Sequence, residues 1–189
     1  MFKLPAIIDP VSADTSADTT REAAEAEQDV TWLAAGQLHE WQSLVALLMT
    51  LPAAMDGQLR RDAGVNLFEY HVLAALSAAS NRTLVLSDLA GLAQGSLSRL
   101  SHAITRLERA GWVVRRSCTD RGSRRTEARL TDAGWAKVED IAPGHVRQAR
   151  RLVIDVLAPE QLTALGDAAR AITAATAAQA PPSCGEPSC

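Results

Sequence analysis

Residues 87–131 constrain the fold of this chain more than any other part of the sequence. They predict a short helix over 88–93 and a tight break at Gln94–Gly95. A longer helix follows, which Ser96 caps and Gly111 ends. Two helices joined through such a tight turn make a helix-turn-helix.

An arginine-rich hairpin is predicted directly after the second of these helices. WVVRRSC, over 112–118, is aromatic and β-branched, while TEARLT, over 126–131, alternates between polar and apolar residues. The turn sequence TDRGSRR lies between them. The chain is therefore expected to be mainly α with a small β-hairpin wing, a winged helix-turn-helix of the α+β class.

The longer helix is predicted to have two different faces. At about 100° per residue, a buried stripe collects Leu97, Leu100, Ala103, Ile104 and Leu107. The opposite arc carries hydrogen-bond donors and no acid: Ser98, Arg99, Ser101, His102, Thr105, Arg106 and Arg109. A helix of this kind fits the major groove of duplex DNA, with its N-terminal residues near the base edges.

Charge is distributed unevenly along the chain. The formal net charge is -3, but residues 1–29 hold two basic and seven acidic groups, and residues 96–129 hold nine arginines and three acids. The arginines at the hairpin tip repel one another, and a polyanion would relieve that repulsion. Of the neighbouring Arg115 and Arg116, we expect one to point at DNA and the other at solvent.

The segment over 86–134 resembles the DNA-binding core of the MarR family of bacterial regulators. The resemblance rests on Ser98-Arg99-Leu100, His102, Arg106-Leu107-Glu108 and the stretch LTDAG over 130–134, and it extends over 30–178. It implies a homodimer built from the first and last helices that binds a palindromic operator. It also implies repression that a small, often phenolic or anionic, effector relieves.

The resemblance and the face pattern together give a set of expected DNA contacts. In the recognition helix these are Ser96, Ser98, Arg99, His102, Thr105 and Arg106, and in the wing Arg116, Arg121, Arg124 and Arg125. The family's wing usually reads Asp-Arg-Arg, whereas this one reads DRGSR over 120–124. Which arginine enters the minor groove therefore stays open.

The remaining segments are expected to serve dimerisation or to form tails. A first helix over 30–51, ended by Pro52, belongs to one dimerisation segment (30–62), and 132–179 forms the other. They flank a DNA-binding lobe over 66–131, so that the whole domain spans 30–179. Polar composition predicts disorder for 1–29 and a flexible tail for 180–189.

Local signals also mark where other elements begin. Asn66 is predicted to cap the helix that starts the lobe, and Glu69, three residues on, completes a capping box. The stretch over 83–86 could pair as a short strand, and Thr131 or Asp132 is predicted to cap the helix after the hairpin. Pro159 is predicted to lie in the first turn of the last helix.

An effector pocket is expected between the lobe and the dimerisation helices, with Trp41 and Tyr70 as candidate lining residues by analogy with the family. The sequence carries no pattern typical of a catalytic site, a metal site or a membrane span. We therefore expect a cytoplasmic, non-enzymatic protein without a cofactor. A redox role for Cys118 or for the Cys184/Cys189 pair stays open.

Two other functions compete with DNA binding. An enzyme that uses the winged helix only for dimerisation would need a catalytic domain, for which the tails are too short and polar. A protein-binding adaptor would favour a neutral recognition face, against which the arginines argue. The sequence does not identify the operator, the effector or the regulated genes. It also leaves the choice between repression and activation open.

Overall fold

The structure, a computed structural model, describes residues 30–120 and 123–179, and within these it leaves the side chains of 118–120 and 123–124 undescribed. The predicted tails, over 1–29 and 180–189, lie outside the described residues. The chain divides into two units, Met1–Val45 and Ala46–Cys189.

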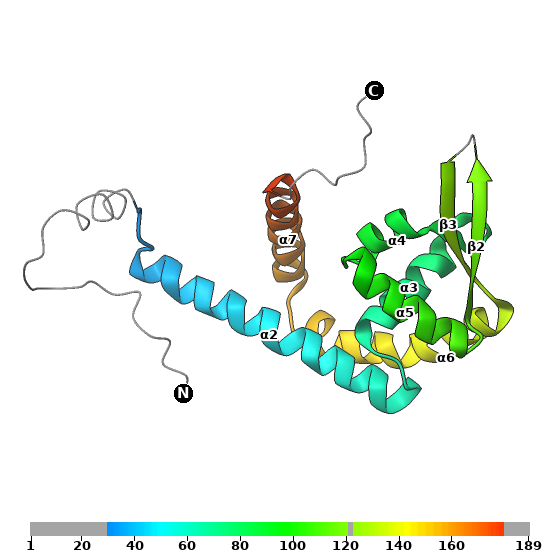
Figure 1. Cartoon of the computed structure of the whole chain (residues 1–189). Helices are drawn as coiled ribbons and strands as arrows, with labels where there is room; N and C mark the ends of the chain where they lie inside the picture. The colour runs from blue at the N-terminus through cyan, green and yellow to red at the C-terminus, as the bar shows by residue number, and fades with distance from the viewer. Residues whose placement is uncertain (1–29, 121–122, 180–189) are drawn as a thin grey trace, which may run out of the picture. The chain divides into compact units, whose positions relative to one another are not determined.

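The first helix, α2 (Ala35–Ala63), is longer than the sequence indicated (Figure 1). We expected it to end before Pro52, and that prediction was wrong. Proline removes one amide donor and kinks a helix, but packing can hold the helix together beyond that point. Here the C-terminal part of α2 is held by Leu59, which is fully buried, and the helix ends at Ala63, directly before Gly64, whose φ is +70°.

Helix α3 (Leu67–Ala78) begins with the capping box that its sequence predicted. The Asn66 side chain accepts a hydrogen bond from the Glu69 amide, and the Glu69 carboxylate accepts one from the Asn66 amide, both at 2.8 Å. Val72, Leu73 and Leu76 of this helix are fully buried. Helix α3 is thus the central element of the lobe's core.

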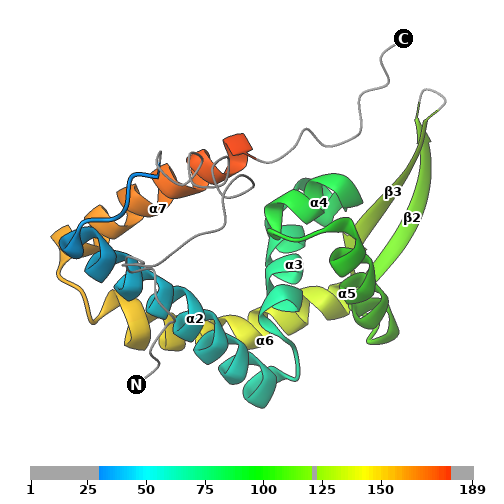
Figure 2. The ribbon, with the colours of Figure 1, turned by 60° about the vertical axis from the view of Figure 1, so that its left-hand side comes forward.

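A small sheet closes one side of this core. The short turn η1 (Ser80–Arg82) leads into β1 (Thr83–Val85), which pairs antiparallel with β3 (Ser123–Leu130), and β3 pairs antiparallel with β2 (Val113–Asp120). The strand order is β1-β3-β2, and the predicted strand and hairpin are confirmed. Figure 2 shows the β2–β3 hairpin extending beyond the helices that pack at its base.

Helices α4 (Leu86–Leu92) and α5 (Leu97–Arg109) pack against α3 and against each other. Four of the five residues predicted for the buried stripe of α5 are buried: Leu100, Ala103, Ile104 and Leu107. The fifth, Leu97, is 59% exposed. It is the first residue of the helix and has no preceding turn to pack under, so angular position alone misplaced it.

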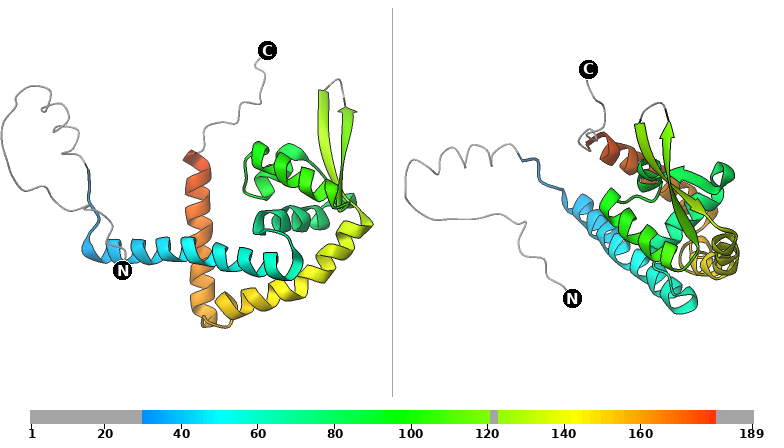
Figure 3. Two further views of the ribbon diagram at one scale, coloured as in Figure 1. Left: turned by 60° about the horizontal axis from the view of Figure 1, so that its bottom comes forward. Right: turned by 45° about the vertical axis from the view of Figure 1, so that its right-hand side comes forward.

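The chain then returns beneath the lobe through α6 (Asp132–Ala149), seen in Figure 3. Thr131 caps this helix by accepting a hydrogen bond from the Gly134 amide at 3.0 Å. Pro143 lies inside α6, and the helix passes into a π-helical turn, η2 (Arg150–Ile154). The last helix, α7 (Pro159–Gln179), begins at the predicted proline and has no buried residue.

Candidate nucleic-acid interface

The turn between α4 and α5 is fixed by close packing. Gln94 adopts a positive φ of 54°, and the Gly95 amide donates to the Ala90 carbonyl at 3.0 Å. A Cβ at Gly95 would lie only 2.6 Å from Cζ of Phe68, so a side chain does not fit there. The start of α5 is therefore set by the core of the lobe.

Helix α5 presents a continuous face of exposed hydrogen-bond donors. Its members are Ser98, Arg99, Ser101, His102, Arg106 and Arg109. Thr105 is half-buried, and the Ser96 hydroxyl is used in the helix cap, where it accepts from the Arg99 amide at 3.2 Å. No acidic side chain lies in this arc, so the face suits a polyanion.

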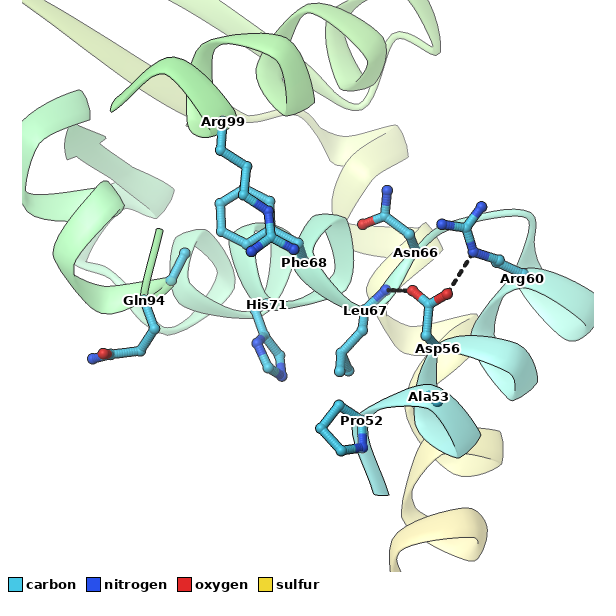
Figure 4. A pocket seen from close by; sticks show the side chains of 11 residues that line it. Pro52, Ala53, Asp56, Arg60, Asn66, Leu67, Phe68, His71, Gln94 and Arg99 are labelled. Atoms are coloured by element: carbon cyan, nitrogen blue, oxygen red, sulfur yellow. Dashed lines mark hydrogen bonds and ion pairs between the residues drawn. The ribbon is translucent and has the colours of Figure 1, made fainter. Parts of the chain in front are cut away.

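Arg99 is held against the body of the lobe while remaining exposed. Its guanidinium carbon lies 4.2 Å from the centre of the Phe68 ring, a cation–π contact. Phe68 is buried, so the ring is a firm platform for the guanidinium. Figure 4 shows Arg99 reaching from α5 over this ring.

Arg106 has a partner that sequence reasoning missed. Its Nε donates to a carboxylate oxygen of Glu69, which is only 8% exposed, whereas the Arg106 side chain is 53% exposed. The only sequence signal for Glu69 was its place in the capping box. The pairing of Glu69 with Arg106 depends on how α3 packs on α5.

Arg115 links the hairpin to α5. Of the neighbouring Arg115 and Arg116, it is therefore Arg115 that faces the helix. Its backbone amide donates to a Glu108 carboxylate oxygen at 3.0 Å, and its Nε lies 2.9 Å from the other oxygen. Its terminal nitrogen donates to the Thr105 hydroxyl and to the Ser101 carbonyl. Thr105, an expected DNA contact, is thus already engaged by Arg115.

The outer face of the hairpin carries the other described arginines. The register pairs Arg116 with Glu127 and Arg125 with Cys118, so that Arg116 and Arg125 share the face opposite Arg115. Both are exposed. Arg121 lies outside the described residues, and for Arg124 only the backbone position in β3, opposite Thr119, is described.

A pocket of about 640 Å³ opens beside Arg99, and we name it the Arg99 pocket (Figure 4). At one wall Asp56 accepts from the Leu67 amide at 2.8 Å and pairs with Nε of Arg60 at 2.6 Å. These two donors, the Leu67 amide first, lower the pKa of the Asp56 carboxyl. The lining comes from α2, α3, the turn and α5: Pro52, Ala53, Asp56, Arg60, Asn66, Leu67, Phe68, His71, Ala93, Gln94 and Arg99.

Trp41 and Tyr70, the residues proposed to line an effector pocket, do not line the Arg99 pocket. Tyr70 is buried in a second cluster with Leu59 and Ile141, its ring centre is 4.4 Å from that of His145, and burial raises its pKa. Trp41 lies in the first unit and is 51% exposed. Among the described residues, no group of three His, Cys, Asp or Glu side chains could hold a metal ion.

No helix within 30–179 combines the length and apolarity needed to cross a bilayer.

Comparison with models of known protein families finds no match, and comparison with curated proteins finds none.

Solved structures give a different result. Sco3205, a MarR family transcriptional regulator from Streptomyces coelicolor, was crystallised in complex with DNA. It is 38% identical to this chain with a TM-score of 0.73, and the match covers 77% of this chain and 90% of Sco3205. The chain belongs to the MarR family.

Two further solved structures are similar to this chain. AbsC, another MarR family transcriptional regulator from Streptomyces coelicolor, is 34% identical over 79% of this chain and 100% of its own, with a TM-score of 0.73. NadR, crystallised in complex with 4-hydroxyphenylacetate, is 25% identical over 76% of this chain and 95% of its own, with a TM-score of 0.54. In MarR terms, α5 is the recognition helix and the β2–β3 hairpin is the wing.

Proposed function

We propose that this MarR-family chain is a transcriptional regulator that binds a palindromic operator as a homodimer and represses until an effector binds. The observation that carries the proposal is the exposed, acid-free donor face of α5, which begins at Ser98 and ends at Arg109. DNA binding by the relative Sco3205 supports it. The cationic face argues against the protein-binding adaptor.

In this proposal the recognition helix reads bases near its N-terminus and the wing holds the backbone. Ser98, Arg99 and His102 are exposed within the first two turns of α5, where the helix would enter the major groove. Arg116 and Arg125 would contact phosphates or the minor groove from the outer face of the wing. Ser96 and Thr105 contribute by fixing the cap and the Arg115 contact.

Dimerisation would use apolar surface that the described part of the chain leaves exposed. In α7, Leu165 and Ile172 are 37% and 51% exposed, and in α2, Leu48 and Met49 are 59% and 73% exposed. Exposed apolar surface of this extent is typical of subunit interfaces. A two-fold pairing would present two recognition helices to half-sites about 34 Å apart.

The effector in this proposal is a small aromatic carboxylate that binds in the Arg99 pocket. Arg60 and Arg99 supply positive charge there, and Phe68 and Leu67 supply apolar surface. The 4-hydroxyphenylacetate bound to NadR belongs to this chemical class. Because Arg99 lies both in the pocket and on the DNA-reading face, an effector carboxylate would compete with DNA for it.

The DNA-binding proposal is tested by a gel shift with the DNA directly upstream of the chain's own gene. We expect Arg99→Ala to weaken binding by about tenfold, the loss of one good base or phosphate contact. Arg170→Ala, an exposed arginine of α7 outside the DNA surface, is the matched control. Equal binding by wild type and Arg99→Ala would remove Arg99 from the interface.

The effector proposal is tested by titrating 4-hydroxyphenylacetate into the preformed protein–DNA complex. Release of DNA at millimolar or lower concentration is expected, together with a higher melting temperature of the free protein. Arg60→Ala should weaken both effects while leaving DNA affinity near that of wild type. DNA release unaffected by Arg60→Ala would move the effector to another site.

A further inference from the structure

Glu69 is a buried carboxylate with two separate tasks. One oxygen accepts the Asn66 amide at 2.8 Å and completes the N-terminal cap of α3. The other accepts Nε of Arg106, which lies on the neighbouring helix α5. With its side chain 8% exposed, Glu69 has lost most of its hydration, and these two donors replace it.

Arg106 is fixed by this pair without being covered by it. Its side chain is 53% exposed, and the hydrogen bond recorded for it among the described residues uses Nε. The two terminal nitrogens therefore remain available as a fork of donors on the exposed arc of α5. A guanidinium already held through Nε loses less rotamer freedom when it meets a phosphate or a guanine.

We infer that Glu69 is a positioning residue for DNA binding, which acts by holding Arg106 in the orientation that the duplex requires. The inference rests on the proposed function and adds to it a residue that does not itself touch DNA. It predicts that Glu69 affects operator affinity only through Arg106. A carboxylate that merely stabilised α3 would affect folding and leave the affinity of the folded protein unchanged.

Glu69→Gln separates the two tasks. Glutamine has a single acceptor oxygen and is well suited to the third helical position of a capping box. Once that oxygen accepts the Asn66 amide, the side chain presents an NH₂ group to Nε of Arg106, and two donors cannot pair. The cap is kept and the support of Arg106 is lost.

The experiment is a double-mutant cycle on operator affinity. Wild type, Glu69→Gln, Arg106→Gln and the double variant are titrated against a duplex that the wild-type protein selects from random sequence. We expect each single variant to bind about tenfold more weakly, and the double variant to match Arg106→Gln within about twofold. Asp132→Asn is the matched control, since it removes a carboxylate from the exposed Arg82–Asp132 pair and should bind as wild type.

The outcomes separate this inference from the function on which it rests. If wild type selects no duplex, the proposed function fails and the inference with it. If wild type binds and Glu69→Gln binds equally well, or if the two losses multiply in the double variant, the inference alone is overturned. Tighter binding by Glu69→Gln would show that Glu69 withholds Arg106 from DNA, which also overturns it.

A second measurement uses only the wild-type protein, in case Glu69→Gln is too unstable to assay. The Nε–H proton of Arg106 should give a slowly exchanging resonance in the free protein, and this resonance should persist in the DNA complex. Loss of that protection on DNA binding would mean that the pair breaks when Arg106 is used. Glu69 would then not position it.

Discussion

The lobe from α3 to β3 and the helix α7 use apolar residues in opposite ways. In the lobe, Leu73, Leu100 and Ile104 are fully buried within one chain. In α7, by contrast, no residue is buried, although Leu165 and Ile172 recur at helical spacing. The lobe can therefore order the exposed donor face of α5 within one chain, whereas α7 needs a partner to bury its apolar stripe.

The largest effect should come from opening the lobe's core. Leu100→Ala is expected to lower the free energy of unfolding by about 2–5 kcal/mol, because it removes a fully buried side chain and leaves a cavity. Leu97→Ala, in the same helix but 59% exposed, should cost roughly 0.5 kcal/mol or less. Urea denaturation at one fixed protomer concentration checks both, and equal losses would contradict the difference in burial between the two leucines.

The next effect concerns the apolar stripe of α7. Ile172→Glu should leave the lobe folded but raise the dimer dissociation constant by about a hundredfold, because it places a charge in an apolar interface. Ala174→Glu introduces the same side chain on the opposite side of the helix and should leave the dimer intact. Sedimentation equilibrium measures both, and a stable Ile172→Glu dimer would show that this stripe is not the interface.

A smaller effect is expected where the wing meets the recognition helix. Arg115→Met keeps much of the side-chain volume but loses the contacts to Glu108 and Thr105, so the wing should become more mobile relative to α5. Operator affinity should fall by about threefold to tenfold. Arg129→Met, an exposed arginine on the outer face of β3, is the comparison variant. A loss no larger than that of Arg129→Met would contradict the role of Arg115 in holding the wing against α5.

The smallest effect is a pH dependence of stability. Burial, and secondarily the charge of His71, lower the pKa of His145 below its usual value. The unfolded chain therefore binds its proton first as the pH falls, and folding stability should decrease between pH 7 and pH 5. His145→Gln should flatten this part of the curve in urea denaturation at each pH. An unchanged slope would mean that His145 does not contribute to it.

What the sequence predicted well was encoded locally. Asn66 and Ser96 were expected to cap their helices, and the third cap was expected at Thr131 or Asp132. Asn66, Ser96 and Thr131 each accept a hydrogen bond from the backbone amide three residues further on. The alternation in β3 and the tight turn at Gly95 are local in the same sense. These features are determined by residues close in the sequence, so they form regardless of how distant segments pack.

What it missed depends on contacts between distant segments. Pro52 was taken to end the first helix, yet tertiary packing of Leu59 carries α2 onward to Ala63. The partners of Arg106 and Arg115 could not be found, because Glu69 is 37 residues from Arg106 and the hairpin contacts α5 only in the folded lobe. The DNA contacts expected from the recognition helix and the wing remain predictions.

The central claim is that two recognition helices of one dimer meet one duplex through the donor face of α5. Hydroxyl-radical footprinting of the wild-type protein on its operator tests it most directly. The account predicts two protected windows, related by the operator's dyad and centred about one helical turn, roughly 34 Å, apart. A single window, or protection without a dyad, would contradict it.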